Sequence, residues 1–166
     1  KLKQALTSTV RAISGDFETT DNLDKNKNLK KQDSFEIDNL NSKSDFIKAR
    51  AESDSAALRK KFSNNKIYKK NLPLNSTCRS LYSIAEKIRY ECLGNKMLKG
   101  VEKNLKDNYN QIINTKRKDQ LKTKEDVPIA EAFELYMLKK FHNIKLNSQT
   151  NNILQFWEND LNHAID

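Results

Sequence analysis

Two cysteines and two histidines are the side chains best suited to metal binding or nucleophilic chemistry, and their spacing keeps them apart. Cys78 and Cys92 fall in one expected helix, where fourteen residues span about 21 Å along the axis, so they cannot share a metal ion or a disulfide there. His142 and His163 have no second ligand four residues away or in a cysteine pair. We therefore predict that both cysteines are buried small residues, and that the chain has no catalytic, cofactor-binding or metal site.

Three charged residues of the central region could take part in polar recognition. Glu86 and Arg89 are three positions apart and can pair on one helix face, with Glu91 close behind. Such a pair is typical of a solvated surface, and the alternative is a contact with another helix or a partner subunit. The sequence has no GxxxxGK[ST] phosphate loop, no Ser/His/Asp arrangement and no D-x-S-x-S adhesion motif. We therefore predict no intrinsic ATPase activity.

The composition indicates a single domain with a lean core. Of 166 residues, 36% are hydrophobic and 32% are charged, and only 3 are glycine. No apolar run is long enough to span a membrane or to serve as a secretory signal. Two cysteines cannot build a disulfide framework, so we expect a cytoplasmic protein.

The net charge of +9 is concentrated in the middle of the chain. Residues 44–72 carry 8 basic and 3 acidic side chains, and residues 73–106 carry 7 basic and 3 acidic ones. One functional alternative is therefore a basic helical module that binds RNA or DNA. Its phosphate contacts would come from Lys60, Lys61, Lys66, Lys69, Lys70, Lys96, Lys99 and Lys103. Against this alternative, the nearby aromatic residues are not grouped as a stacking surface, and we expect most of them to lie in the core. These residues are Phe62, Tyr68, Tyr82 and Tyr90.

Apolar residues recur at helical spacing, and no alternating strand pattern exceeds four residues, so we predict an all-α fold. The expected form is an irregular bundle of five or six helices with a central αα-hairpin at about 77–113. The expected helices cover 1–14, 45–62, 77–93, 95–113 and 128–142, with a last one from about 148. The expected organisation is an N-terminal helix (1–14), a mobile linker or loop (15–43) and a helical domain (44–166).

Local signals predict where some helices begin and end. Ser44 is the expected N-cap of the second helix, whose apolar face is interrupted by the polar run 53–55. Gly94 is expected to end the 77–93 helix, and Asn95 to cap the next. Gly100 lies inside that next helix, where glycine costs about 0.5–1 kcal/mol relative to alanine. We expect it to permit a close approach between helices.

The run from Ile84 to Leu105 resembles the N-terminal region of the CobT subunit of aerobic cobaltochelatase. That family shows E-x-x-R-x-E-x-x-G, followed by a helix that ends in G-V-x-x-N-L. Here these places are filled by Glu86, Arg89, Glu91, Gly94, Gly100, Val101, Asn104 and Leu105. Residues 51–58 resemble the family's A-D-S-x-A-L stretch with one residue inserted, and residues 126–132 resemble its D-x-P-L-A-x-A helix start. The family usually carries a His-Asp pair and a further His after the A-D-S-x-A-L stretch, where this chain has Ser63-Asn64 and Tyr68.

The resemblance implies a role in ATP-dependent insertion of cobalt into hydrogenobyrinic acid a,c-diamide during aerobic cobalamin synthesis. In that family an AAA+ subunit hydrolyses ATP with Mg, a large subunit binds the corrinoid and cobalt, and CobT couples the two. The resemblance also implies that this chain is an N-terminal part, without the family's acidic linker and von Willebrand-type domain. We expect a non-catalytic docking element that is oligomeric within the complex and contacts both other subunits. The expected partner-binding residues are Glu86, Arg89, Glu91, Gly94, Lys96, Gly100, Lys103 and Asn104.

Overall fold

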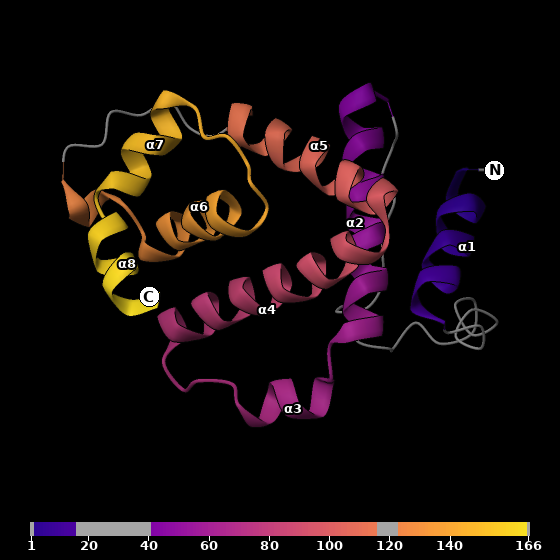
Figure 1. The fold of residues 1–166 in the computed structure, drawn as a ribbon, viewed down its shortest axis with the longest axis horizontal. Coiled ribbons are helices and arrows are strands. Elements are labelled where there is room, and N and C mark those ends of the chain that lie inside the picture. The colour runs from indigo at the N-terminus through magenta and orange to yellow at the C-terminus, as the bar shows by residue number, and fades with distance from the viewer. Residues whose placement is uncertain (1, 16–40, 116–122, 166) are drawn as a thin grey trace.

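The computed structural model describes residues 2–15, 41–115 and 123–165, and their regular structure is entirely helical (Figure 1). The prediction of an all-α fold is confirmed. The α-helices of these residues are α1 (Leu2–Ser14), α2 (Lys43–Phe62), α3 (Asn65–Lys70), α4 (Ser76–Met97), α5 (Lys99–Thr115), α6 (Ile129–Phe141), α7 (Ser148–Gln155) and α8 (Glu158–Ile165). A short 3-10 helix, η1 (Lys124–Asp126), precedes α6. The mobile linker predicted for residues 15–43 falls mostly on 16–40, outside the described residues.

Eight α-helices in the described residues exceed the five or six expected, and two local features account for the difference. The basic connector after α2 contains the six-residue helix α3, capped by Asn64, whose side chain accepts from the backbone of Lys66 and Ile67. The expected last helix is divided into α7 and α8 by a turn at Phe156 and Trp157. Neither feature changes the fold class.

The helix ends follow capping chemistry, although not always at the expected residue. Gly15 ends α1 with a positive φ of 72°, a conformation that glycine adopts without strain. Ser42 rather than Ser44 caps α2, because Ser42 and Asp45 exchange hydrogen bonds in a capping box. Gly94 does not end α4, which continues to Met97, so Asn95 lies within α4 and does not cap α5.

The helices are arranged around two neighbouring centres. On one side α2 contacts α1, α4 and α5, and on the other α6 contacts α4, α7 and α8. Figure 1 shows α4 and α5 meeting beside α2 and then diverging, with α6 seen between them. Within α6, apolar side chains are buried on nearly every side, as expected for a central helix. Phe141, the last residue of the helix, is 47% exposed.

The predicted hairpin corresponds to α4 and α5, which are joined through Leu98. Val101, Leu105, Tyr109 and Ile113 of α5 are buried, close to the stripe that the spacing predicts.

No described helix has the length and apolar character needed to cross a membrane.

Candidate functional site

The eight predicted partner-binding residues lie on α4 and the first half of α5, but they do not form one surface. Arg89, Lys96, Gly100 and Lys103 are exposed, and Glu86 and Asn104 are partly buried. Glu91 and Gly94 are buried. The set therefore divides into residues that can meet a partner and residues that hold the helices together.

Glu86 and Arg89 form an ion pair that also reaches the end of α2. The Arg89 guanidinium donates to both carboxylate oxygens of Glu86, at 2.7 and 2.8 Å, and to the carbonyl oxygen of Phe62 at 2.7 Å. Ser63 donates to the same carboxylate at 2.6 Å. Because Arg89 and then Ser63 bond to it, the pKa of Glu86 is held below its usual value. The pair is thus a contact between helices that binds a terminal carbonyl of α2.

Glu91, predicted to face a partner, is completely buried, so its placement on a docking surface is wrong. Its carboxylate accepts from the Ser55 hydroxyl and from the Tyr109 hydroxyl, each at 2.6 Å. The Nε2 atom of His142 lies 3.5 Å from the same carboxylate. A buried carboxylate requires such donors, because desolvating an unpaired charge is costly. Three helices and the end of a fourth therefore meet at Glu91.

His142, the C-cap residue of α6, is 1% exposed. The Asn95 amide nitrogen lies 3.1 Å from its Nδ1, and the Tyr109 ring packs against it with centroids 5.4 Å apart. With Asn95 donating to Nδ1, the imidazole proton lies on Nε2 and faces Glu91. Burial, followed by the nearby cations Lys87 and Lys106, lowers the pKa of His142 to about 4. Burial also raises the pKa values of Glu91 and Tyr109.

The polar run 53–55 of α2 explains how these helices are held together. Ser53 faces the Leu6 carbonyl of α1 at 3.5 Å, and Asp54 accepts from Asn104 of α5 at 2.7 Å. Ser55 donates to Glu91 of α4. Three consecutive side chains of α2 thus bond to three different helices. The sequence marks this run as unusual against an apolar face, but only the fold identifies its partners.

The two central glycines behave in opposite ways. A Cβ added to Gly94 would overlap the Leu58 side chain of α2 and lie 2.9 Å from its Cγ. A Cβ at Gly100 would meet no heavy atom within 4 Å, so the expectation that Gly100 permits close helix approach is wrong. Gly94 is the residue that allows α2 and α4 to pack closely.

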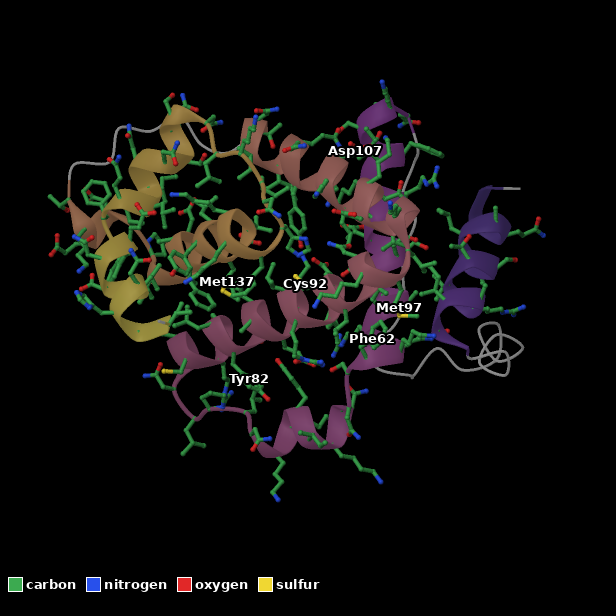
Figure 2. All side chains as sticks on the ribbon, in the orientation of Figure 1. Phe62, Tyr82, Cys92, Met97, Asp107 and Met137 are labelled. Carbon is green, nitrogen blue, oxygen red and sulfur yellow. The ribbon has the colours of Figure 1, made fainter. Side chains whose placement is uncertain are left out.

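An apolar recess lies where α4 joins α5. It has a volume of about 310 Å³ and is lined by Ala12, Ile13, Leu58, Lys61, Phe62, Met97 and Leu98. Figure 2 shows Met97 and Phe62 close together beside α1 and the lower end of α2. Met97 is 58% exposed and Leu98 is 40% exposed, so the rim of the recess is apolar and accessible to solvent.

The prediction that both cysteines are buried is wrong for Cys78, which is exposed, and Cys92 is only partly buried. Cys92 lies 3.9 Å from His142 Nε2, a contact that sequence spacing did not suggest. In the described part of the chain, no three His, Cys, Asp or Glu side chains are grouped as metal ligands would be.

Two of the aromatic residues assigned to the core instead stack on each other, with the Tyr68 and Tyr82 ring centroids 5.1 Å apart.

Comparison with known proteins gives one family. The family model described as cobalamin biosynthesis protein CobT matches residues 1–166, the whole chain. No curated protein and no solved structure matches the chain.

Proposed function

The chain belongs to the CobT family of cobalamin biosynthesis, and we propose that it is a helical docking part of an ATP-dependent cobaltochelatase. In this proposal it joins the AAA+ ATPase subunit to the large subunit that holds the corrinoid. ATP and Mg act on the ATPase subunit, and cobalt is the substrate that the complex inserts into hydrogenobyrinic acid a,c-diamide. This chain provides contacts and no chemistry of its own.

The observation that carries the proposal is the apolar surface at the α4–α5 junction. Met97 and Leu98 are large, exposed and next to a recess of about 310 Å³. Accessible apolar residues beside a hollow are typical of protein–protein contacts. Lys96 and Lys103 are exposed on the adjoining turns and provide the polar rim that such contacts usually have.

The buried polar network supports a docking role because it keeps the junction rigid. Glu91, Tyr109 and His142 hold α4, α5 and the end of α6 in one arrangement, and Asp54 with Asn104 holds α2 to α5. A surface that is fixed before binding loses less conformational entropy when a partner binds. The exposed residues can therefore act together as one docking surface.

Co-purification with the two other subunits tests this function. The double variant Met97→Ser/Leu98→Ser should bind the AAA+ subunit about tenfold more weakly, because two apolar side chains no longer become buried. The matched control is Phe141→Ser/Ile165→Ser, which changes two other exposed apolar residues, 47% and 37% accessible. Failure of the wild-type chain to bind either subunit would refute the docking function. Equal binding by the two variants would refute the assigned surface.

A further inference from the structure

A strongly basic and acid-free segment surrounds α3. From Ser55 to Ala85 the chain has no Asp or Glu. The same segment has seven cationic side chains, namely Arg59, Lys60, Lys61, Lys66, Lys69, Lys70 and Arg79. Elsewhere in the described residues several lysines pair with carboxylates, as Lys103 does with Asp107 at 2.8 Å. No carboxylate of the segment itself offsets this charge.

The helix at its centre, α3, takes no part in the core. It has no buried residue, and in Figure 1 it lies below α4, apart from the other helices. It is held to α4 by the stacking of Tyr68 on Tyr82 and by a 2.7 Å hydrogen bond between the hydroxyls of Tyr68 and Ser83. Figure 2 shows Tyr82 directed from α4 into the space beside α3. Because six residues alone do not form a stable helix in water, these contacts and the Asn64 cap must hold it.

The base of α3 is fixed by the Glu86–Arg89 pair. Arg89 binds the carbonyl of Phe62, the last residue of α2, and Glu86 binds the hydroxyl of Ser63. Asn64, the N-cap of α3, follows directly. The pair therefore sets the direction in which the chain leaves α2 and enters α3. The family motif on α4 thus positions an exposed arm that lies outside the motif.

The exposed face of this arm combines positive charge with apolar side chains. Lys66, Lys69 and Lys70 are exposed, and none of the three has a carboxylate partner among the described residues. Ile67 is 58% exposed and Leu74 is 93% exposed. Charged and apolar residues mixed in this way suit a protein segment better than a nucleic acid. The two tyrosine rings that could stack on bases are already stacked on each other.

We propose that the α3 arm, residues 64–75, binds an acidic segment of a partner protein. Carboxylates of that segment pair with Lys66, Lys69 and Lys70, and its apolar side chains contact Ile67 and Leu74. Opposite charges steer the encounter and fix its register, while the apolar contacts supply affinity. The proposal rests on the proposed docking function, because the partner is a subunit of the same complex. It adds a second contact surface, distinct from the recess beside Met97.

Binding of purified, fluorescently labelled AAA+ and corrinoid-binding subunits to the full chain tests the proposal. The variant Lys66→Gln/Lys69→Gln/Lys70→Gln should bind one of the subunits about tenfold more weakly at low salt. The difference should shrink at high salt because exposed charge pairs are screened. The control Lys43→Gln/Lys48→Gln/Lys145→Gln removes the same charge from other exposed positions and should bind like wild type. Since α3 has no buried residue and the three control lysines are exposed, all these variants should keep the wild-type circular dichroism spectrum and melting temperature.

A second variant separates the apolar contribution from the charge. Ile67→Ser/Leu74→Ser should weaken binding of the same subunit while leaving the slope of affinity against salt unchanged. Equal binding by wild type and the α3 lysine variant would refute the arm and leave the docking function intact. Absence of wild-type binding to both subunits would refute the arm together with the docking function. Micromolar binding of a single-stranded or duplex oligonucleotide that the α3 lysine variant loses, with subunit binding unaffected, would replace the protein partner by a nucleic acid.

Discussion

The Tyr109 hydroxyl of α5 donates to the buried Glu91 carboxylate of α4 across the hairpin, at 2.6 Å. Both residues are almost inaccessible to solvent, at 2% and 0% exposure. The bond joins the two helices where they diverge around α6. An apolar stripe alone would allow α4 and α5 to slide, whereas a buried hydrogen-bonded carboxylate requires one register.

The first prediction concerns this bond. Tyr109→Phe should lower the free energy of unfolding by about 1–3 kcal/mol, because it leaves a buried acceptor with one donor fewer. The matched control is Tyr136→Phe, whose hydroxyl bonds at 2.9 Å to the exposed Asn162 and can be replaced there by water. Urea denaturation of the three proteins measures both effects. A control that loses as much stability as Tyr109→Phe would contradict the role given to the buried bond.

The second prediction is a dependence of stability on pH that arises from His142. Its pKa is lowered by burial from 6.5 to about 4 in the folded protein. The unfolded chain therefore holds more protons between these values, so stability should fall as the pH is lowered from about 6.5 towards 4. The burial-raised pKa of Glu91 acts in the opposite sense, because its contribution is complete below 4.5 and is lost as the pH rises through its folded pKa.

Urea denaturation at a series of pH values tests the His142 contribution. The facing groups Lys87, Lys106 and Glu102 remain in the variant His142→Gln, which removes only the titrating imidazole. Its stability should change less steeply below pH 6.5, by up to about 1.4 kcal/mol per pH unit. Slopes are compared rather than absolute stabilities, so a less stable variant remains informative. Parallel slopes for wild type and variant would contradict the prediction.

The third prediction contrasts the two glycines of the family motif. Gly94→Ala should destabilise the fold by about 1–3 kcal/mol, because its methyl group would overlap Leu58 in a packed interface. Gly100→Ala should be neutral or stabilising by about 0.5 kcal/mol, because its position is open and helical. In the double variant Gly94→Ala/Leu58→Ala the two costs should not add, since removal of Leu58 frees the space. Thermal melts of wild type, Gly94→Ala, Gly100→Ala, Leu58→Ala and the double variant provide the measurement, and additive costs would rule out the Leu58 contact.

The helical spacing of apolar residues predicted the helices that carry their own apolar stripe. It failed where a helix depends on contacts with other parts of the fold. The α5 stripe through Val101, Leu105 and Tyr109 is visible in the sequence because its residues recur at helical spacing. No apolar periodicity predicts α3, because this helix depends on the Asn64 cap and on Tyr82 of α4. Local chemistry favoured a helix end at Gly94, but α4 continues to Met97, and the missing side chain of Gly94 leaves room for Leu58 of α2.

The buried site was only partly predictable, because its members are distant in sequence. Glu91 lies three residues after Ile88 on the apolar face of α4, and this position is the one signal that could have marked it as buried. Its partners Ser55, Tyr109 and His142 come from three other segments. Without the fold, a glutamate in a charged motif is naturally taken for a surface residue.

The last prediction concerns Arg89, for which a docking role and a structural role were both open. The side chain is 47% exposed, yet it binds Glu86 and a terminal carbonyl of α2. Arg89→Ala should therefore cost about 1–2 kcal/mol, more than an isolated surface pair. Arg79→Ala is the matched control, because Arg79 also donates to a carbonyl, that of Pro73 at 2.7 Å, but has no described carboxylate partner. It should cost less than about 1 kcal/mol.

A positioning role for Arg89 also predicts a local effect beyond the loss of stability. If the Glu86–Arg89 pair fixes the base of α3, Arg89→Ala should speed amide hydrogen exchange across 63–70 more than across the buried half of α5. Arg89→Lys keeps the charge but not the forked guanidinium, so it should restore only part of the protection. A melting temperature like wild type, together with unchanged exchange across 63–70, would remove Arg89 from this structural role. Arg89 would then be assigned to a contact with a partner subunit.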